Sequence, residues 1–388
     1  MEVYVLDDRF RRETVVDKFE SLIWTERLSA WGDFQLILYS NSSNRKLFQI
    51  GKRLAMNESY RVMVIETVED KTDSEGKSNL IVKGRSLEAI LDDRLAAADI
   101  SVTPEPGRWI LIGTATEIAR KVFHDICIEG ILSTDDILPI IEGSIFPQST
   151  VSEPTEILTI FAEPRSVYLG IKDLCEIYNM GFRILRDLDT SNLYFDVYMG
   201  NDRTSRQSVH PAVIFSPDLE NLKNTTEFKT IENYKNVAYV YGPTATAIYI
   251  PVNVDPDISG FDRKILYVRA DDIDDPDPEV AELLLLFRGR GQLGNFQVFA
   301  GYDGELNRNI EYKYDIDYFL GDLVEMQSLD GSISILQVTE QIFVSDAEGE
   351  RTYPTLSLNQ FIMQGTWLAW DYDEEWSDMT DEEWEDVP

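Results

Sequence analysis

The chain has 388 residues, of which 43% are apolar and 11% aromatic, so it is long and apolar enough to form two or three folded domains. It contains 35 Lys and Arg against 70 Asp and Glu, a net charge of −35. A field of this sign repels phosphate backbones and anionic lipids, which argues against a protein that grips nucleic acid or binds membranes stably. The most apolar run, residues 283–287, is much shorter than the about 20 residues of a membrane helix, and residues 1–10 lack the pattern of a signal peptide. We therefore expect synthesis in a cytoplasm.

Residues 1–99 are expected to form a small β domain closed by a helix. Residues 21–24 and 34–39 are rich in aromatic and branched side chains, and Gly32 with Asp33 supplies turn chemistry between them. This pattern predicts two paired strands.

The rest of this first domain is expected to contain a hairpin around residues 57–59 and a helix that begins after Ser86. Ser86 is a residue type that caps helices, and Glu88 would lie in the first turn, where a negative charge is favourable. The apolar residues of this helix would recur at helical spacing, and they are Leu87, Ile90, Leu91 and Leu95.

Residues 100–204 are expected to form an inserted α+β domain. Residues 115–128 and 166–182 each place apolar side chains on one helical face, and Gly181 is predicted to end the second helix. Two paired strands are expected directly after it.

Residues 205–360 return to a β pattern with one short helix at 277–290. Within 312–327 the side chains alternate as on a strand, and Gly321 with Asp322 predicts a sharp corner into a further strand. The sequence shows no long-period repeat, which argues against a solenoid or a propeller.

Two motifs in the sequence resemble ligand sites. Residues Gly289 to Gly294 match G-x-G-x-x-G, but they follow a predicted helix and precede a strand, the reverse of a dinucleotide site, so we predict a glycine-rich turn. His124 and Cys127 lack the further ligands that zinc needs. We predict a partly buried histidine there, and free, buried thiols at Cys127 and Cys175.

Acidic residues are too numerous for spacing alone to select a catalytic pair. Residues 271–279 hold six acids but lack the glycine of a calcium loop, so we predict a solvated loop that starts a helix. Asp33, Asp196 and Asp322 lie beside predicted strand ends, where turn residues are common in any protein. No catalytic, cofactor-binding or metal-binding residue is predicted, and no enzyme.

Residues 361–388 form an acidic, tryptophan-rich C-terminal segment. One interpretation is a disordered solubilising tail, because like charges in a short segment repel each other. Solubility does not require tryptophan, however. Trp370, Trp376 and Trp384 among carboxylates are typical of a docking strip whose rings enter apolar pockets while the acids meet a basic rim.

Five stretches, taken in order, resemble the tail-hub proteins of long-tailed, siphovirus-type bacteriophages, also called tail-associated, baseplate-hub or minor tail proteins. The most specific is the pattern of a strand followed by Leu-Gly-Asp and apolar residues in the last of them. The stretches are LIWTERLSAWGDFQL (22–36), LIVKGRSLEAILDDR (80–94), GNDRTSRQ with PAVIFSPDLENL (200–222), NYKNVAYVYG (233–242) and YDIDYFLGDLVEM (314–326).

The resemblance implies a mainly β fold with two β-barrel-like domains, at 1–99 and 205–360, and an inserted α+β domain. It implies a homotrimeric ring at the virion tail tip that closes the tail tube and organises host attachment. The implied partners are distal-tail and tail-tube proteins, tail-tip or fibre proteins and the tape-measure protein, with DNA only passing through the lumen and no cofactor.

Two other functions remain open from the sequence. A receptor- or carbohydrate-binding tail-tip module would use the tryptophans of the C-terminal segment, because aromatic rings stack on sugars. A cell-wall hydrolase would need a cleft with paired acids, and no segment of the sequence indicates one.

Overall fold

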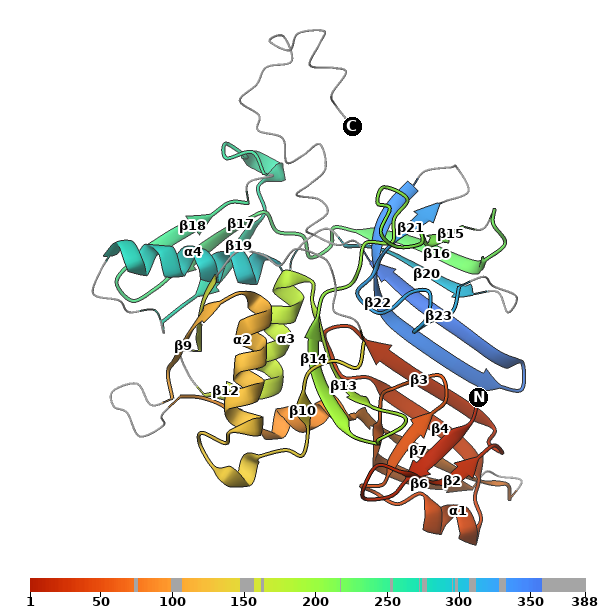
Figure 1. Ribbon diagram of the computed structural model, residues 1–388. Helices are drawn as coiled ribbons and strands as arrows, with labels where there is room; N and C mark the ends of the chain where they lie inside the picture. Colours follow the sequence, from red (N-terminus) through yellow and green to blue (C-terminus); the bar gives the residue numbers. More distant parts are fainter. Residues whose placement is uncertain are drawn as a thin grey trace. The chain divides into compact units, whose positions relative to one another are not determined.

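The computed structural model describes residues 1–72, 76–98, 107–146, 157–161, 164–216, 218–251, 254–271, 273, 278–294, 296, 299–306, 312–327 and 333–357 (Figure 1). It is mainly β and divides into two compact units. The first comprises Met1–Glu232 and Val298–Leu358, and the described core of the second is Asn233–Gln297. None of the described helices is long and apolar enough to cross a membrane.

A sheet of thirteen strands organises the first unit. The strands run in the order β16-β20-β23-β22-β3-β4-β7-β6-β5-β1-β2, and β21 joins β22 and β15 beside this path. Their bounds are β1 Val3–Leu6, β2 Arg12–Val16, β3 Ser21–Arg27, β4 Asp33–Tyr39, β5 Arg53–Met56, β6 Met63–Thr72, β7 Ser78–Ser86, β15 Ile214–Phe215, β16 Leu222–Thr230, β20 Phe299–Leu306, β21 Leu323–Gln327, β22 Ile333–Asp346 and β23 Gly349–Ser357.

Strands β3 and β22 join two parts of the sheet, which we call the early β region (β1 to β7) and the late β region (β15, β16 and β20 to β23). They pair antiparallel, with Trp24 opposite Phe343 and Thr25 opposite Ile342. The predicted pair of strands at the start of the chain is confirmed, because β3 pairs with β4 and Trp24 lies opposite Phe34. The path of the sheet is open at β2 and β16, so the strands that the structure describes do not close a barrel.

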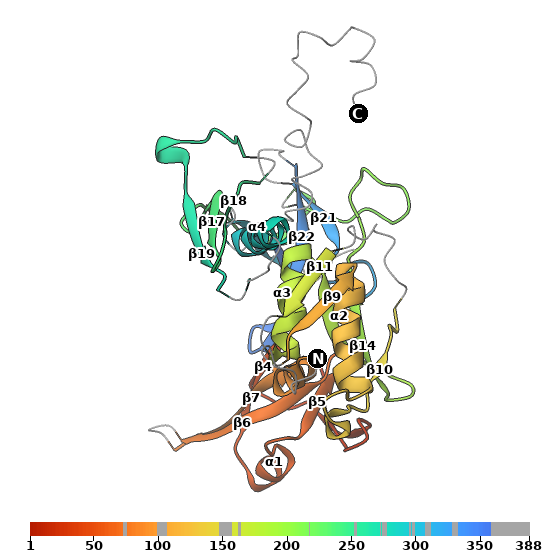
Figure 2. The same ribbon diagram turned by 90° about the vertical axis from the view of Figure 1, so that its left-hand side faces the viewer.

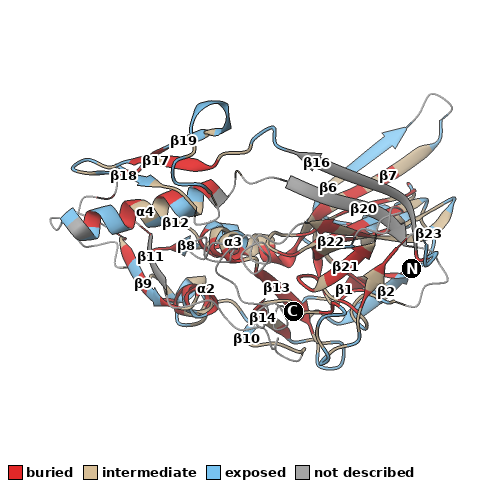
Figure 3. Ribbon diagram, turned by 90° about the horizontal axis from the view of Figure 1, so that it is seen from above, coloured by how far each residue is buried: buried red, intermediate tan, exposed pale blue. Residues whose placement is uncertain are grey.

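The two tryptophans of the opening hairpin have different roles. Trp24 is fully buried in the core of the early β region, 6.0 Å from the ring of Phe34. Trp31 stacks on Tyr168 at 4.0 Å between ring centroids, and the guanidinium of Arg85 lies over its other side, 4.6 Å from the ring centroid. Trp31 therefore connects the hairpin to the helical part of the unit. The buried stretches of the sheet are red in Figure 3.

Between the two β regions lies a segment of helices and short strands, the α+β segment, which belongs to the same compact unit as the sheet. Helix α2 (Ala115–Phe123) begins with a capping box in which Thr114 and Glu117 satisfy each other's backbone N–H groups. Helix α3 (Val167–Tyr178) is capped by Ser166. The segment also contains β8 Leu95–Ala96, β9 Trp109–Gly113, β10 Ile141–Glu142, β11 Ile157–Phe161, β12 Arg165–Ser166, β13 Gly181–Arg186 and β14 Leu193–Tyr198, with short helical turns η2 His124–Ile128 and η3 Thr134–Asp136.

The second unit is a three-stranded sheet with one helix. Strands β17 (Val237–Tyr241), β18 (Thr246–Tyr249) and β19 (Ile265–Arg269) lie in the order β18-β17-β19, and the turn η4 spans Gly260–Asp262. Helix α4 (Pro278–Gly294) runs along one face of this sheet (Figure 2).

Two expectations about helix ends were wrong. The segment after Ser86 is a 3-10 helix, η1 (Leu87–Asp93), and Leu95 already belongs to β8. Ser86 occupies the N-cap position and Glu88 the first turn, as predicted, but the Ser86 hydroxyl accepts a hydrogen bond from the Gly32 N–H at 2.7 Å and makes no cap hydrogen bond. Helix α3 ends before Gly181, because Asn179 adopts the left-handed conformation with φ of +51° and terminates it.

The glycine-rich motif was also misjudged. Gly289 to Gly294 form the last turns of α4 and not a turn between elements. A β-carbon on Gly289 would lie 2.9 Å from a methyl group of Val240 and 3.0 Å from the β-carbon of Tyr249, so glycine is needed where the helix approaches the sheet. Similarly, residues 312–318 form turns with one isolated bridge and no strand, although the corner at Gly321, with φ of +92°, is confirmed.

Several elements of the first unit were not predicted, among them α1 (Ser42–Leu47) and the strands β2, β8, β9, β10, β11, β12 and β16. Strand β2 and the short helix α1 have no buried apolar stripe in their sequences. Because both elements are short and largely polar, the periodicity of their side chains gives no signal.

Candidate functional site

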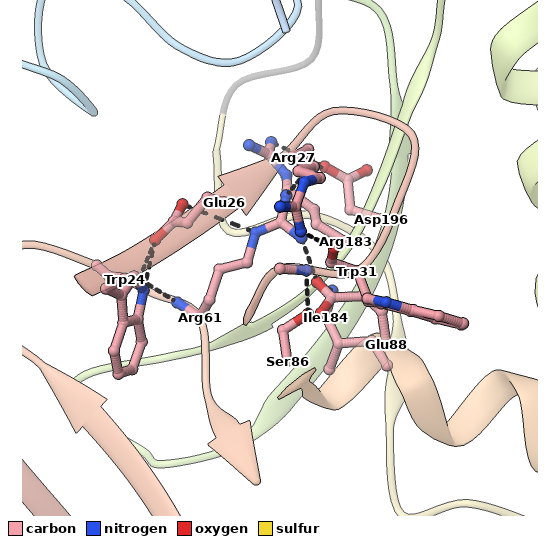
Figure 4. Close-up of polar contacts among 12 residues, drawn as sticks. Trp24, Glu26, Arg27, Trp31, Arg61, Ser86, Glu88, Arg183, Ile184 and Asp196 are labelled. Carbon is pink, nitrogen blue, oxygen red and sulfur yellow. Dashed lines mark hydrogen bonds and ion pairs between the residues drawn. The ribbon is translucent and has the colours of Figure 1, made fainter. Parts of the chain in front are cut away.

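The most unusual site in the first unit is a buried group of charges around Arg61 (Figure 4). The Arg61 side chain is 2% exposed, and its Nη1 donates to Oε1 of Glu88 at 2.5 Å. Its Nη2 donates to the backbone carbonyl of Arg27 at 2.9 Å. Arg61 also forms an isolated antiparallel bridge with Leu185 in β13. Through its side chain and its backbone, Arg61 therefore connects the early sheet, η1 and the α+β segment.

Glu26, on β3, is the second carboxylate of this group. Its carboxylate accepts hydrogen bonds from the Ser59 hydroxyl, from Trp24 Nε1 at 3.3 Å and from the Tyr314 hydroxyl at 2.9 Å. Arg61 Nε lies 3.7 Å from its Oε2. Because Tyr314 lies far along the chain from Glu26, this carboxylate also anchors the segment that precedes β21.

Glu88 holds the α+β segment from the other side of the guanidinium. Besides the bond from Arg61, its Oε1 accepts the backbone N–H of Ile184 at 2.8 Å. Its Oε2 is buried and has no hydrogen-bond partner among the described residues. Figure 4 shows Glu26 and Glu88 on different sides of the Arg61 guanidinium.

A neighbouring pair, Arg183 and Asp196, joins β13 to β14. Arg183 Nη2 lies 3.0 Å from Oδ2 of Asp196, which also accepts the Ser144 hydroxyl at 2.7 Å. The Arg183 guanidinium lies over the ring of Tyr198, 3.9 Å from its centroid. This pair extends the polar group into the interior of the α+β segment.

The electrostatics of the group follow from burial. Burial raises the pKa of Glu26, against the opposing charge of Arg61 and the hydrogen bonds from Ser59 and Tyr314. Burial also acts to lower the pKa of Arg61, but the carboxylates of Glu88 and Glu26 outweigh it and raise that pKa. The pKa of the nearby Asp315 is raised by burial and then by the charge of Glu26.

A second buried pair lies at the corner before β21. Asp322 accepts hydrogen bonds from Arg203 Nε, from the Asn201 N–H at 2.7 Å and from the Phe319 N–H at 3.0 Å. Burial raises its pKa, although the Asn201 N–H and the Arg203 charge act in the opposite direction.

The backbone is tightly packed at the same corner. A β-carbon on Gly200 would overlap the carbonyl group of Gly321, so both chain segments require glycine where they pass each other. The Leu-Gly-Asp pattern of the sequence thus reflects a close backbone approach and a buried carboxylate.

The histidine singled out by sequence is half-exposed and paired with acids. His124 Nδ1 lies 2.8 Å from Oε2 of Glu142, and its Nε2 lies 3.4 Å from Oε1 of Glu129. The hydrogen bond to Glu142 raises its pKa. His124, Asp125 and Glu129 could offer three ligand atoms within 4.8 Å of one another, but Lys121 already pairs with Asp125 at 2.6 Å. These contacts are accounted for as ion pairs.

The remaining sequence candidates are placed as follows. Cys127 and Cys175 are free and buried, as predicted. Asp33 pairs with Arg27 at 2.6 Å, and it does not lie with Asp196 and Asp322 as a catalytic set. Most of the acidic loop 271–279, and the docking residues Trp370, Trp376 and Trp384, lie outside the described residues.

Sequence reasoning missed Arg61, Glu88 and Arg183 as a group. Arg61 and Arg183 lie beside apolar residues in predicted strands, where a charge is unusual, whereas Glu88 was predicted only as a favourable charge in a first helical turn. That signal could have marked the two arginines as buried and paired, but it does not identify their partners. Arg61, Glu88 and Arg183 form hydrogen bonds and ion pairs with other residues of the protein. The group therefore fixes chain segments relative to one another.

Comparisons with known proteins identify a matching family and similar solved structures. The model of the family described as "Siphovirus ReqiPepy6 Gp37-like protein" matches residues 2–356. A comparison with curated protein sequences returns no match.

Two solved structures share the fold over almost their whole length. The tail protein from Neisseria meningitidis MC58 is 12% identical, with a TM-score of 0.56, and the match covers 92% of this chain and 96% of that one. The 43 kDa tail protein of prophage MuSo2 from Shewanella oneidensis is 16% identical, with a TM-score of 0.53 and the same two coverages, 92% and 96%. At such low identities the likeness concerns the fold.

Proposed function

The chain belongs to the Siphovirus ReqiPepy6 Gp37-like protein family of phage tail proteins, and on this premise we propose that it is the hub at the distal end of a siphovirus-type tail. As a hub it closes the tail tube, organises the tail-tip proteins for host attachment and lets DNA pass. The observation that carries the proposal is the fold match over 92% of the chain to two tail proteins.

The open sheet supports a cyclic assembly of copies. In the described part of the sheet, β2 pairs only with β1, and β16 pairs only with β20. Unpaired strand edges favour addition of another strand, and a closed ring can cover them. The hub is accordingly a homotrimer in which the early and late β regions act as two barrel-like segments per chain.

The charge of the chain suits a conduit. A net charge of −35 per copy offers DNA few of the cationic contacts that release counterions. DNA therefore slides through the lumen without sticking. The role is structural, without catalysis or cofactor.

The partners of such a hub are tail proteins. The distal-tail and tail-tube proteins lie above it, tail-tip or fibre proteins lie below it, and the tape-measure protein is a further contact. The acidic C-terminal segment is the docking strip for a neighbouring tip protein or for the adjacent hub subunit, through Trp370, Trp376 and Trp384.

Localisation of the protein on assembled phage tests this proposal. A small peptide tag is inserted between Asp346 and Gly349, at the tip of the β22–β23 hairpin, and tails are labelled with a gold-conjugated antibody. The proposal predicts label at the distal end of the tail. Label along the tube or at the head-proximal end would contradict it.

A further inference from the structure

The described residues of the second unit place no helix or strand on one face of its sheet. Helix α4 covers the other face, on which Ala238, Val240 and Ala247 are buried. The alternate positions of the three strands point to the opposite face, because side chains alternate along a strand. We refer to this opposite side as the outer face of β17, β18 and β19 (Figure 2).

The outer face is apolar and aromatic. Tyr267 is 64% exposed and Ile248 is 49% exposed, and both lie opposite Tyr239 in the register of the sheet. The rings of Tyr241 and Tyr267 lie 5.2 Å apart. Ile265 continues the row and is also exposed. Contiguous exposed apolar side chains of this kind mark interaction surfaces.

The charged side chains at this face are Arg263 and the ion pair of Arg269 with Asp271. The outward positions of the three strands hold Val, Tyr, Ile, Thr and Arg, and no carboxylate, although acids outnumber bases two to one in the chain. Arg263 lies over the ring of Tyr239, 5.8 Å from its centroid, and donates to the Tyr239 hydroxyl at 3.2 Å. Arg269 is the last outward residue of β19, where it pairs with Asp271. The face therefore suits an occupant with rings and negative charge.

The chain itself carries such an occupant. Residues 371–388 contain ten acids and no Lys or Arg, and Trp370, Trp376 and Trp384 are spaced along the segment. Indole rings cover exposed tyrosine and isoleucine well, and carboxylates beside them would meet Arg263 and share Arg269 with Asp271.

We propose that the outer face of β17, β18 and β19 receives residues 370–388 of a neighbouring copy of this chain. A ring supplies one such segment for each face and holds them at high local concentration, which strengthens a contact that would be weak between free molecules. The inference rests on the proposed homotrimer.

Photo-crosslinking of the full-length protein tests the inference. A benzophenone amino acid replaces Ile248, and protein made in ¹⁵N medium is mixed with unlabelled protein under reassembly conditions. After irradiation, mass spectrometry identifies crosslinked peptides, and the particle mass is measured on the same sample. The matched control places the benzophenone at Ile50, an exposed isoleucine of the first unit.

The expected result is a crosslink from position 248 to residues 370–388 in heavy–light pairs, and no such crosslink from position 50. Replacing Tyr241→Ala together with Tyr267→Ala, with the probe in place, should lower the yield about ten-fold, as removal of an interface hot spot does. Tyr39→Ala, at an exposed tyrosine of β4, should leave it unchanged.

Two results would overturn the inference. One is a trimer whose position 248 crosslinks elsewhere or nowhere, which leaves the hub proposal standing. The other is crosslinks to residues 370–388 only within one copy. A monomeric particle mass would instead count against the proposed function itself.

Discussion

Arg61 and Glu88 form an ion pair from which water is excluded: the two side chains are 2% and 0% exposed, and Nη1 lies 2.5 Å from Oε1. Burial of two charges is costly, so the pair is weak evidence for high stability. The pair instead fixes the positions of chain segments, because Oε1 of Glu88 also accepts a hydrogen bond from the backbone N–H of Ile184. The pair therefore sets how the early sheet meets the α+β segment.

Removal of one partner should be strongly destabilising. Glu88→Ala leaves the Arg61 charge buried with only the more distant Glu26, and should lower the free energy of unfolding by about 3–5 kcal/mol. The control is Glu66→Ala, which removes an exposed pair with Arg85 and should cost less than about 1 kcal/mol. Denaturant midpoints followed by circular dichroism measure both. Equal losses for the two variants would show that the buried pair has no special role.

Glu26 should make stability depend on pH. Because burial raises its pKa in the folded state, its contribution is fully present below the unfolded pKa, about 4.3, and is lost as the pH rises through the folded pKa. The charge of Arg61 and the hydroxyl of Tyr314 act to lower the pKa of Glu26, and the charge of Glu26 in turn raises the pKa of Asp315. Wild-type stability should therefore fall as the pH rises through this window.

Glu26→Gln, which resembles the protonated side chain, should flatten that fall. Unfolding free energies from about pH 4 to about pH 8 measure the slope, and Glu66→Gln serves as the exposed control. A variant at Glu26 with the wild-type slope would refute the assignment.

The two thiols should be unreactive in the folded protein. Burial raises the pKa of the Cys127 thiol to about 12 and raises the pKa of the Cys175 thiol further. Since the thiolate is the reactive species, iodoacetamide at about pH 8 should modify neither residue until the protein is unfolded. Intact mass before and after addition of urea reports the result. Rapid stoichiometric labelling without urea would mean that at least one thiol is accessible and ionised.

The C-terminal segment should reinforce the contacts between copies without being required for the trimer to form. Trp376→Ala with Trp384→Ala, or deletion of residues 371–388, should leave three copies in the particle, because the segment only adds to the other contacts between copies. Either change should abolish the crosslink from position 248 and reduce incorporation of the next tip component, which binds the ring that the segment reinforces. Added salt should weaken the contact further. Ser377→Ala with Met379→Ala is a control in the same segment that keeps the rings. If the deletion variant assembled into infectious tails of full composition, the segment would have no docking role.

Local signals in the sequence predicted local structure well. The opening hairpin follows from aromatic and branched residues on both sides of Gly32, and the α+β segment follows from helical spacing. The pairing of Trp24 with Phe343 could not be predicted, because register between distant strands depends on the whole fold.

The wrong expectations at Ser86 and Gly289 also arise because tertiary contacts decide the role of each residue. Ser86 is a good cap in sequence, but a tertiary hydrogen bond from Gly32 takes its hydroxyl. Gly289 has the composition of a turn, but its missing side chain serves close packing of α4 on β17. In the sequence Arg61 is only a charge beside apolar residues and Glu88 only an acid in a first helical turn, and their pairing is a property of the folded chain.

The mass of the purified particle in solution tests the hub proposal most directly. Native mass spectrometry at micromolar concentration should show three copies of the 44.5 kDa chain, about 134 kDa, and projection images should show a ring with three-fold symmetry. A particle that stays at 44.5 kDa at high micromolar concentration, with no ring in assembled tails, would contradict it.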